Sequence, residues 1–134
     1  MISDVSEYDR WLRQARNTLL SAGRDREAGD YNWSCFKAQQ AAEFALKGLL
    51  YGIGVSAVGH SLLRLLGDLE RRGVEVDEVK GCSRILDRHY IPARYPNAHA
   101  EGAPFEFYDA STAEEAIECA RRIIGFVEKV AQHV

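Results

Sequence analysis

The sequence has few cysteines, few prolines and no large excess of either charge. Its 134 residues include three cysteines, Cys35, Cys82 and Cys119. They are odd in number and widely spaced, so the sequence shows neither zinc-ligand spacing nor a disulfide framework. Cys35 and Cys82 fall on predicted helix faces, which favours buried free thiols in a reducing cytoplasm. We therefore predict no metal, no cofactor and no disulfide framework.

Charge is nearly balanced, and long apolar runs are missing. The chain has 17 Lys and Arg residues against 20 Asp and Glu residues, a formal net charge of −3. This balance excludes a bulk electrostatic attraction to nucleic acid or to an anionic membrane. No apolar run approaches the roughly 20 residues of a membrane helix, and the first ten residues contain no signal-peptide core. We expect one cytoplasmic domain over residues 1–134, long enough to bury a hydrophobic core.

All three prolines, Pro92, Pro96 and Pro104, lie close together in one stretch. Proline lacks an N–H group and disfavours helix in the residue before it, so Tyr90 to Asp109 should be irregular. In a compact domain, a loop of this length is usually functional or is held in place by packing.

Outside that stretch, apolar residues recur at helical spacing, and no strand-like alternation or repeat appears. The charged segment 24–28 is either a frayed helix end or a solvated connector, and we favour a surface turn. The predicted helices run from Val5 to about Gly23, from Asp30 to Tyr51, from His60 or Ser61 to Gly73, from Asp77 to near His89, and onward from Ser111 or Thr112. Asp30, Ser61 and Asp77 are candidate caps, and Glu114 and Glu115 complete capping boxes for the last helix. The predicted fold is an all-α, antiparallel bundle of four to five helices.

The segment from Asp30 to Tyr51, which contains no proline and should form one long helix, is the centre of this prediction. It carries two separate apolar faces, so neighbouring helices should cover it on both sides. One face is small and aliphatic, and the other is aromatic: Cys35, Ala38, Ala42, Ala45, Leu46 and Leu49 on the first, and Trp33, Phe44 and Tyr51 on the second.

A polar stripe of Gln39, Gln40, Glu43 and Lys47 lies between these two faces. Glu43 and Lys47 have the i, i+4 spacing of a helix-surface ion pair, and we favour that interpretation. The alternative is a polar seam at a subunit interface or a ligand site.

Three segments resemble motifs of the HEPN family of small helical domains. Residues 36–47, Phe-Lys-Ala-Gln-Gln-Ala-Ala-Glu-Phe-Ala-Leu-Lys, are similar to its second-helix signature, and residues 59–62, Gly-His-Ser-Leu, to the turn that opens its third helix. Residues 93–98, Ala-Arg-Tyr-Pro-Asn-Ala, resemble a motif of one prokaryotic subgroup. The resemblance extends from about Tyr8 to Val130. It implies a homodimer that acts beside a minimal nucleotidyltransferase in a toxin–antitoxin-like pair.

Arg94 and His99 fit, through this resemblance, the Arg-x4–6-His spacing of nuclease-active family members. Arginine offers planar donors that suit phosphate, and histidine moves protons near neutral pH. In the alternative interpretation, Arg94 fastens the loop by bonding carbonyl oxygens or the acids Glu101, Glu106 and Asp109. His60 is expected to cap or pack, because no general-base partner stands next to it in the sequence.

Two functions therefore stay open. The first, which we favour, is a non-catalytic module that binds nucleotide or nucleic acid through Tyr95, Asn97, Gln40, Glu43 and Lys47. The second is a metal-independent endoribonuclease that uses Arg94 and His99. The first is favoured because prolines bracket the arginine and the overall charge is not basic.

Overall fold

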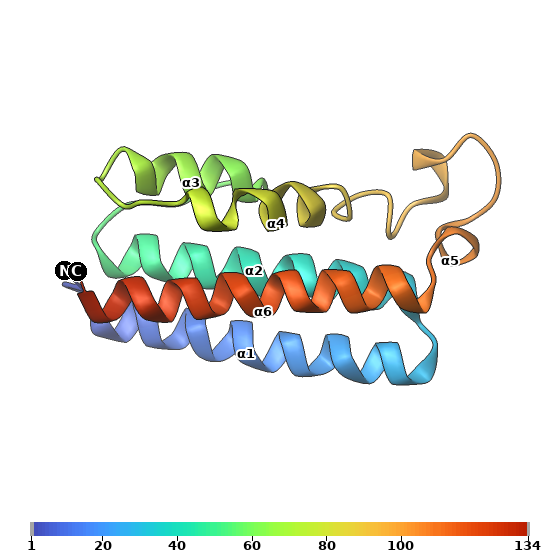
Figure 1. Ribbon diagram of the computed structural model, residues 1–134, viewed down its shortest axis with the longest axis horizontal. Coiled ribbons are helices and arrows are strands. Elements are labelled where there is room, and N and C mark those ends of the chain that lie inside the picture. Colours follow the sequence, from blue (N-terminus) through green and yellow to red (C-terminus); the bar gives the residue numbers. More distant parts are fainter. Residues whose placement is uncertain (1, 134) are drawn as a thin grey trace.

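The computed structural model describes residues 2–133, and every regular element in that range is helical. The predicted all-α bundle is therefore confirmed. Three long helices lie side by side, and α3 and α4 form the remaining side of the bundle (Figure 1). The elements are α1 (Val5–Ala28), α2 (Tyr31–Gly52), α3 (Leu62–Glu70), α4 (Asp77–Asp87), the 3-10 turn η1 (Pro96–Ala98), α5 (Pro104–Phe107) and α6 (Ala110–His133). No helix of the described range is both long and apolar enough to cross a bilayer.

Helix α2 lies between α1 and α6, as its two apolar faces predicted. The aliphatic face is almost entirely inaccessible to solvent, from Cys35 to Leu49. On the aromatic face, the ring of Trp11 from α1 stacks on Tyr51 at 5.2 Å between centroids and meets Phe44 at 5.9 Å. Burial of the aliphatic face removes apolar area from water and stabilises the bundle, whereas Trp33 of the predicted aromatic face is 45% exposed.

Helix α1 continues to Ala28, so the surface turn predicted for residues 24–28 is wrong. Arg24, Arg26 and Glu27 are adequate helix formers, and nothing in the segment interrupts the helix. Gly29 ends it instead, with φ of 82° and its N–H bonded to the carbonyl of Arg26. Glycine adopts this left-handed conformation without steric cost.

The caps differ from prediction at three of four helix starts. Ser61 does cap α3, since its hydroxyl accepts a bond from the Arg64 N–H. Asp30 stands at the N-cap of α2, but its side chain makes no capping bond. Asp77 is the first residue inside α4, with Val76 at the cap. For α6, Asp109 Oδ1 accepts the Thr112 N–H at 2.8 Å, which replaces the predicted capping boxes at Ser111 and Thr112.

The prediction of buried free thiols is confirmed for Cys35 and wrong for Cys82. Cys82 of α4 and Cys119 of α6 form a disulfide, with their Cα atoms 5.0 Å apart. The two residues are separated by 37 positions, and only the packing of α4 against α6 brings them together. Cys35 is the free, buried thiol, and burial raises its pKa to about 12, with smaller contributions from Asp109 and Glu115.

Close contact between α1 and α2 depends on a glycine. A Cβ atom at Gly48 would lie 2.8 Å from the Cβ of Trp11, whereas a Cβ at Gly23 would meet nothing within 4 Å. Both glycines lie inside long helices, where alanine is intrinsically better by about 1 kcal/mol.

We predict opposite effects for alanine at these two positions. Gly23→Ala should raise the free energy of unfolding by about 0.5–1 kcal/mol, and Gly48→Ala should lower it by about 1–3 kcal/mol because the helices must separate. Urea denaturation followed by circular dichroism measures both. Equal stabilisation by the two variants would contradict this account of the α1–α2 contact.

Candidate functional site

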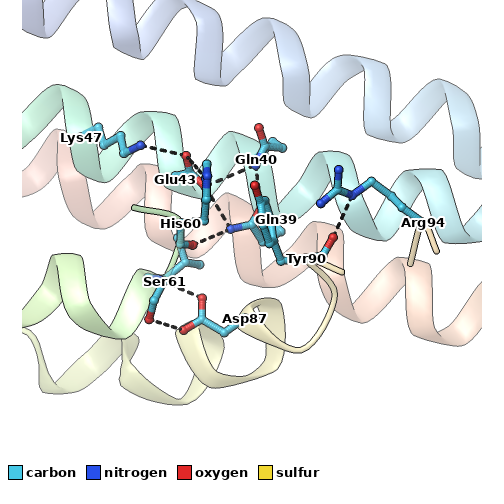
Figure 2. A network of polar contacts seen from close by, with 10 residues as sticks. Gln39, Gln40, Glu43, Lys47, His60, Ser61, Asp87, Tyr90 and Arg94 are labelled. Carbon is cyan, nitrogen blue, oxygen red and sulfur yellow. Dashed lines mark hydrogen bonds and ion pairs between the residues drawn. The ribbon is translucent and has the colours of Figure 1, made fainter. Parts of the chain in front are cut away.

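The polar stripe of α2 is buried, so its predicted position on the helix surface is wrong. Gln39 is 0% exposed and Glu43 is 3% exposed. The predicted Glu43–Lys47 pair does form, at 3.0 Å, but the Lys47 side chain is itself only 12% exposed. The turn before α3 covers the stripe, as Figure 2 shows.

Every oxygen of the Glu43 carboxylate has a partner. The side-chain amides of Gln39 and Gln40 donate to Oε1 at 3.3 Å and 3.2 Å, and Lys47 Nζ donates to Oε2. The Nδ1 atom of His60 lies 3.2 Å from both oxygens. A buried carboxylate without such partners would cost several kcal/mol. These contacts therefore hold the turn before α3 against α2.

His60 packs, as one of the two expected alternatives, and it also contacts a buried carboxylate that the sequence did not indicate. Its backbone carbonyl accepts a bond from Gln39 at 3.0 Å, and its ring stacks on Tyr90 at 4.4 Å between centroids. The side chain is 53% exposed even though Nδ1 faces the buried Glu43. Sequence reasoning missed this contact because Glu43 and His60 are 17 residues apart on two different elements.

Arg94 lies against three aromatic rings. Its Cζ atom is 4.2 Å from the Phe36 centroid, 4.6 Å from that of Tyr90 and 5.0 Å from that of Tyr95. Its Nε donates to the Tyr90 carbonyl at 2.8 Å, so a carbonyl contact predicted by the alternative interpretation is present.

Several donors of Arg94 have no hydrogen-bond partner among residues 2–133. Neither terminal nitrogen donates to Glu101, Glu106, Asp109 or any other acceptor in residues 2–133. Arginine presents a rigid fork of donors that matches phosphate, and aromatic rings hold the fork in place.

The contacts of His99 differ from those of Arg94. Its Nε2 bonds the Pro92 carbonyl at 2.7 Å, and its ring stacks on Phe107 at 4.8 Å between centroids. Within residues 2–133, no hydrogen bond or ring contact joins His99 to Arg94. Tyr95 is 47% exposed, and Asn97 lies exposed in η1. Of the predicted site residues, Gln40, Glu43 and Lys47 form one network, Arg94 and Tyr95 belong to one aromatic cluster, and His99 stands apart.

The loop between α4 and α6 is mostly irregular, as predicted, although it contains η1 and α5. One hydrogen bond ties this loop to α2, and a second joins the two ends of the loop to each other. Asn32 Nδ2 donates to the Ala93 carbonyl at 3.0 Å, and His89 Nδ1 lies 3.1 Å from the Tyr108 hydroxyl. Burial, with a smaller contribution from Arg88, lowers the pKa of His89 to about 4. Burial raises the pKa of Tyr108 to about 12. Within residues 2–133, no cluster of three or more His, Cys, Asp or Glu side chains could hold a metal ion.

The lowered pKa of His89 predicts a loss of stability in acid. Between about pH 6.5 and about pH 4, the unfolded chain takes up a proton at this position and the folded chain does not. Stability due to His89 is therefore complete above about pH 6.5 and falls by about 3 kcal/mol toward pH 4. His89→Gln should flatten this part of the stability–pH curve, as measured by urea denaturation at several pH values. Unchanged curvature in the variant would contradict the prediction.

Comparison with solved structures places this geometry among known folds. The protein TT1696 from Thermus thermophilus is 44% identical, with a TM-score of 0.89 over 93% of this chain and 98% of its own. ST0689, an archaeal HEPN homologue, is 38% identical, with a TM-score of 0.77 over 91% of this chain and 95% of its own. An HEPN domain protein from Thermotoga maritima is 32% identical, with a TM-score of 0.75 over 93% of this chain and 99% of its own.

Among curated proteins, none matches the sequence significantly. The family model of the HEPN domain matches residues 8–130, which is nearly the whole described chain. The helical bundle, the α2 signature and these structural relatives agree, and the chain belongs to the HEPN domain family.

Proposed function

We propose that this protein is a dimeric HEPN module that binds nucleotide or single-stranded nucleic acid at the Arg94 aromatic cluster. The cluster is defined by Phe36, Tyr90, Arg94 and Tyr95. The observation that carries the proposal is the Arg94 guanidinium, held within 5.0 Å of three ring centroids while its terminal nitrogens lack partners in residues 2–133.

Single-stranded nucleic acids are bound by this combination of groups. Bases stack on exposed aromatic rings, and arginine pairs with the phosphates between them. Tyr95 is 47% exposed, and Trp33, whose ring meets Phe36 edge-on at 6.2 Å between centroids, is 45% exposed. Since the chain is slightly acidic overall, such binding would rest on this local cluster and not on bulk charge.

The proposal also covers the HEPN subgroup of this chain and its protein partners. We assign the chain to the prokaryotic HEPN subgroup with the motif at residues 93–98, which acts beside a minimal nucleotidyltransferase in a toxin–antitoxin-like pair. The family resemblance implies a homodimer, and large apolar side chains on the outside of the bundle support it, because an interface between two copies would bury them. The most exposed of these are Val58, Phe105, Val5, Leu20 and Phe107.

An endoribonuclease that pairs Arg94 with His99 is the second candidate function. The Nε2 atom of His99 bonds the Pro92 carbonyl, and the His99 side chain lies apart from the Arg94 aromatic cluster. Both observations favour binding over this mechanism.

Removal of the arginine should abolish most of the binding. Arg94→Ala and Arg94→Lys should each weaken the binding of a fluorescein-labelled single-stranded RNA by about tenfold or more, because lysine keeps the charge but loses the planar fork. Tyr95→Ala should weaken it about tenfold through lost stacking. Fluorescence anisotropy measures all three, with AMP and ATP as competitors.

The matched control is Arg121→Ala. Arg121 is exposed on α6 and pairs with Glu118 at 2.7 Å, outside the Arg94 aromatic cluster. Equal affinity of Arg94→Ala and the native protein, with folding intact by circular dichroism, would refute the proposed binding surface.

The dimer should have twice the 15.0 kDa mass of one chain. Light scattering after size-exclusion chromatography measures this mass at micromolar concentration. Tagged protein from the native host should also retain a nucleotidyltransferase after washing. A monomer mass, with no nucleotidyltransferase retained, would refute this part of the proposal.

A further inference from the structure

The disulfide between Cys82 and Cys119 joins α4 covalently to α6. Cys119 is 5% exposed, whereas Cys82 is only partly buried against the core. Disulfides are reduced by a thiolate that attacks one of the two sulfur atoms, so the rate depends on access to that atom. Cys82 is the more accessible of the pair, and Cys119 is therefore the leaving group when a small thiol attacks.

The apolar packing of α4 is limited. The helix has 11 residues, and its buried apolar side chains are Val79 and Leu86. Val76 stands at its N-cap and provides no side-chain capping bond. The ion pair of Glu78 with Lys129 of α6 is exposed, and exposed pairs contribute little to stability. Because a helix this short is marginal by itself, the disulfide supplies a large share of what holds α4 on α6.

The last turn of α4 holds the start of α3. Asp87 accepts bonds from the Ser61 hydroxyl at 3.1 Å and from the N–H groups of Leu62 and Leu63 at 2.7 Å and 3.2 Å. Figure 2 shows this carboxylate directed at Ser61. The first N–H groups of a helix have no partner within the helix, so α3 depends on this acceptor. A displacement of α4 would therefore also disturb the start of α3.

Helix α4 also leads directly into the loop that carries Arg94. The carbonyl of Tyr90 accepts the Arg94 Nε at 2.8 Å, and the Tyr90 ring lies 4.6 Å from the Arg94 Cζ. The same ring stacks on His60, and His89 Nδ1 lies 3.1 Å from the Tyr108 hydroxyl. These contacts connect the disulfide, through α4, to the Arg94 aromatic cluster.

We propose that the Cys82–Cys119 pair is a redox switch for this cluster. The disulfide keeps α4 on α6 and Arg94 in its binding geometry, whereas reduction by a low-molecular-weight thiol lets α4 open locally and weakens binding. The effect on binding rests on the proposed function of the Arg94 aromatic cluster. The sequence predicts a cytoplasmic location, and disulfides in such reducing compartments are usually transient and serve as redox sensors.

Reduction consumes two molecules of the thiol. The first, as its thiolate, forms a bond to the Cys82 sulfur while the bond between Cys82 and Cys119 breaks, and Cys119 leaves as a thiolate. The second thiolate attacks the sulfur of the first, which gives the oxidised form of the small thiol and frees Cys82. The two protons lost by the small thiols pass to Cys82 and Cys119. Two electrons have then moved from the thiols to the protein, and the oxidised small thiol can reverse the reaction.

The test compares the oxidised and the reduced full chain, with dithiothreitol as the reductant and the gain of two hydrogens in the intact mass as proof of reduction. Hydrogen exchange followed by mass spectrometry should show that amides of residues 77–87 exchange about tenfold faster or more in the reduced chain. Amides of α1 should keep their rates. Fluorescence anisotropy with labelled single-stranded RNA should show an affinity about fivefold lower or more after reduction.

Two variants separate the switch from other effects of the reductant. Cys82→Ser should exchange and bind as the reduced chain does, and dithiothreitol should change neither property further. Cys35→Ala is the matched control, because this buried thiol lies outside the disulfide. It should respond to the reductant as the native protein does.

The contrary results are distinct. Equal exchange of residues 77–87 in the two redox states would overturn the inference, as would equal RNA affinity in the two states. A native chain whose Cys82 and Cys119 stay reduced after treatment with oxidised dithiothreitol or oxidised glutathione would also overturn it. Absence of RNA binding in both states would instead refute the proposed function, and the exchange rates would still decide whether the disulfide controls α4.

Discussion

The buried carboxylate of Glu43 constrains where the turn before α3 lies on α2. An ionised group that is 3% exposed is tolerated only if nearly all its hydrogen-bonding capacity is used. Lys47, Gln39 and Gln40 supply donors from the same helix, and His60 supplies the last one from the following turn. The position of that turn is therefore tied to α2 by a polar requirement, in addition to the apolar packing of α3.

Aromatic contacts connect this turn to the loop between α4 and α6. His60 stacks on Tyr90, and Tyr90 supports Arg94 through both its ring and its carbonyl. The contact of Asn32 with Ala93 holds the middle of the loop on α2, and the contact of His89 with Tyr108 joins the two ends of the loop. A segment rich in proline thus has a defined place without regular structure, because its backbone and side chains are bonded to helices that are already rigid.

Membership in the HEPN family defines the scaffold, while chemistry depends on individual side chains. The Arg94–His99 spacing draws attention from sequence alone, yet the two side chains contact different partners. Glu43 and His60 lie in two separate segments that resemble family motifs, but neither segment alone indicates that the two side chains touch. The difference between the partners of Arg94 and His99 is the reason for our proposal that binding uses the Arg94 aromatic cluster and not an Arg94–His99 pair.

The sequence by itself determined the helical bundle and its central helix. Apolar residues at helical spacing specify which face of α2 is buried, and burial of that face lowers the free energy in any arrangement of neighbours. Ser61 as a cap and the irregular loop after α4 followed from local chemistry in the same way. These features depend on residues within a few positions of each other.

Only the tertiary structure decided the features that depend on distant residues. Glu43 and Lys47 have the same spacing whether a turn covers them or water does, so their burial could not be read from α2. The Cys82–Cys119 disulfide, the His60 contact and the separation of His99 from Arg94 all depend on how elements far apart in the chain pack together. Packing brings such residues together or keeps them apart through the sum of many contacts, and no short stretch of sequence contains that sum.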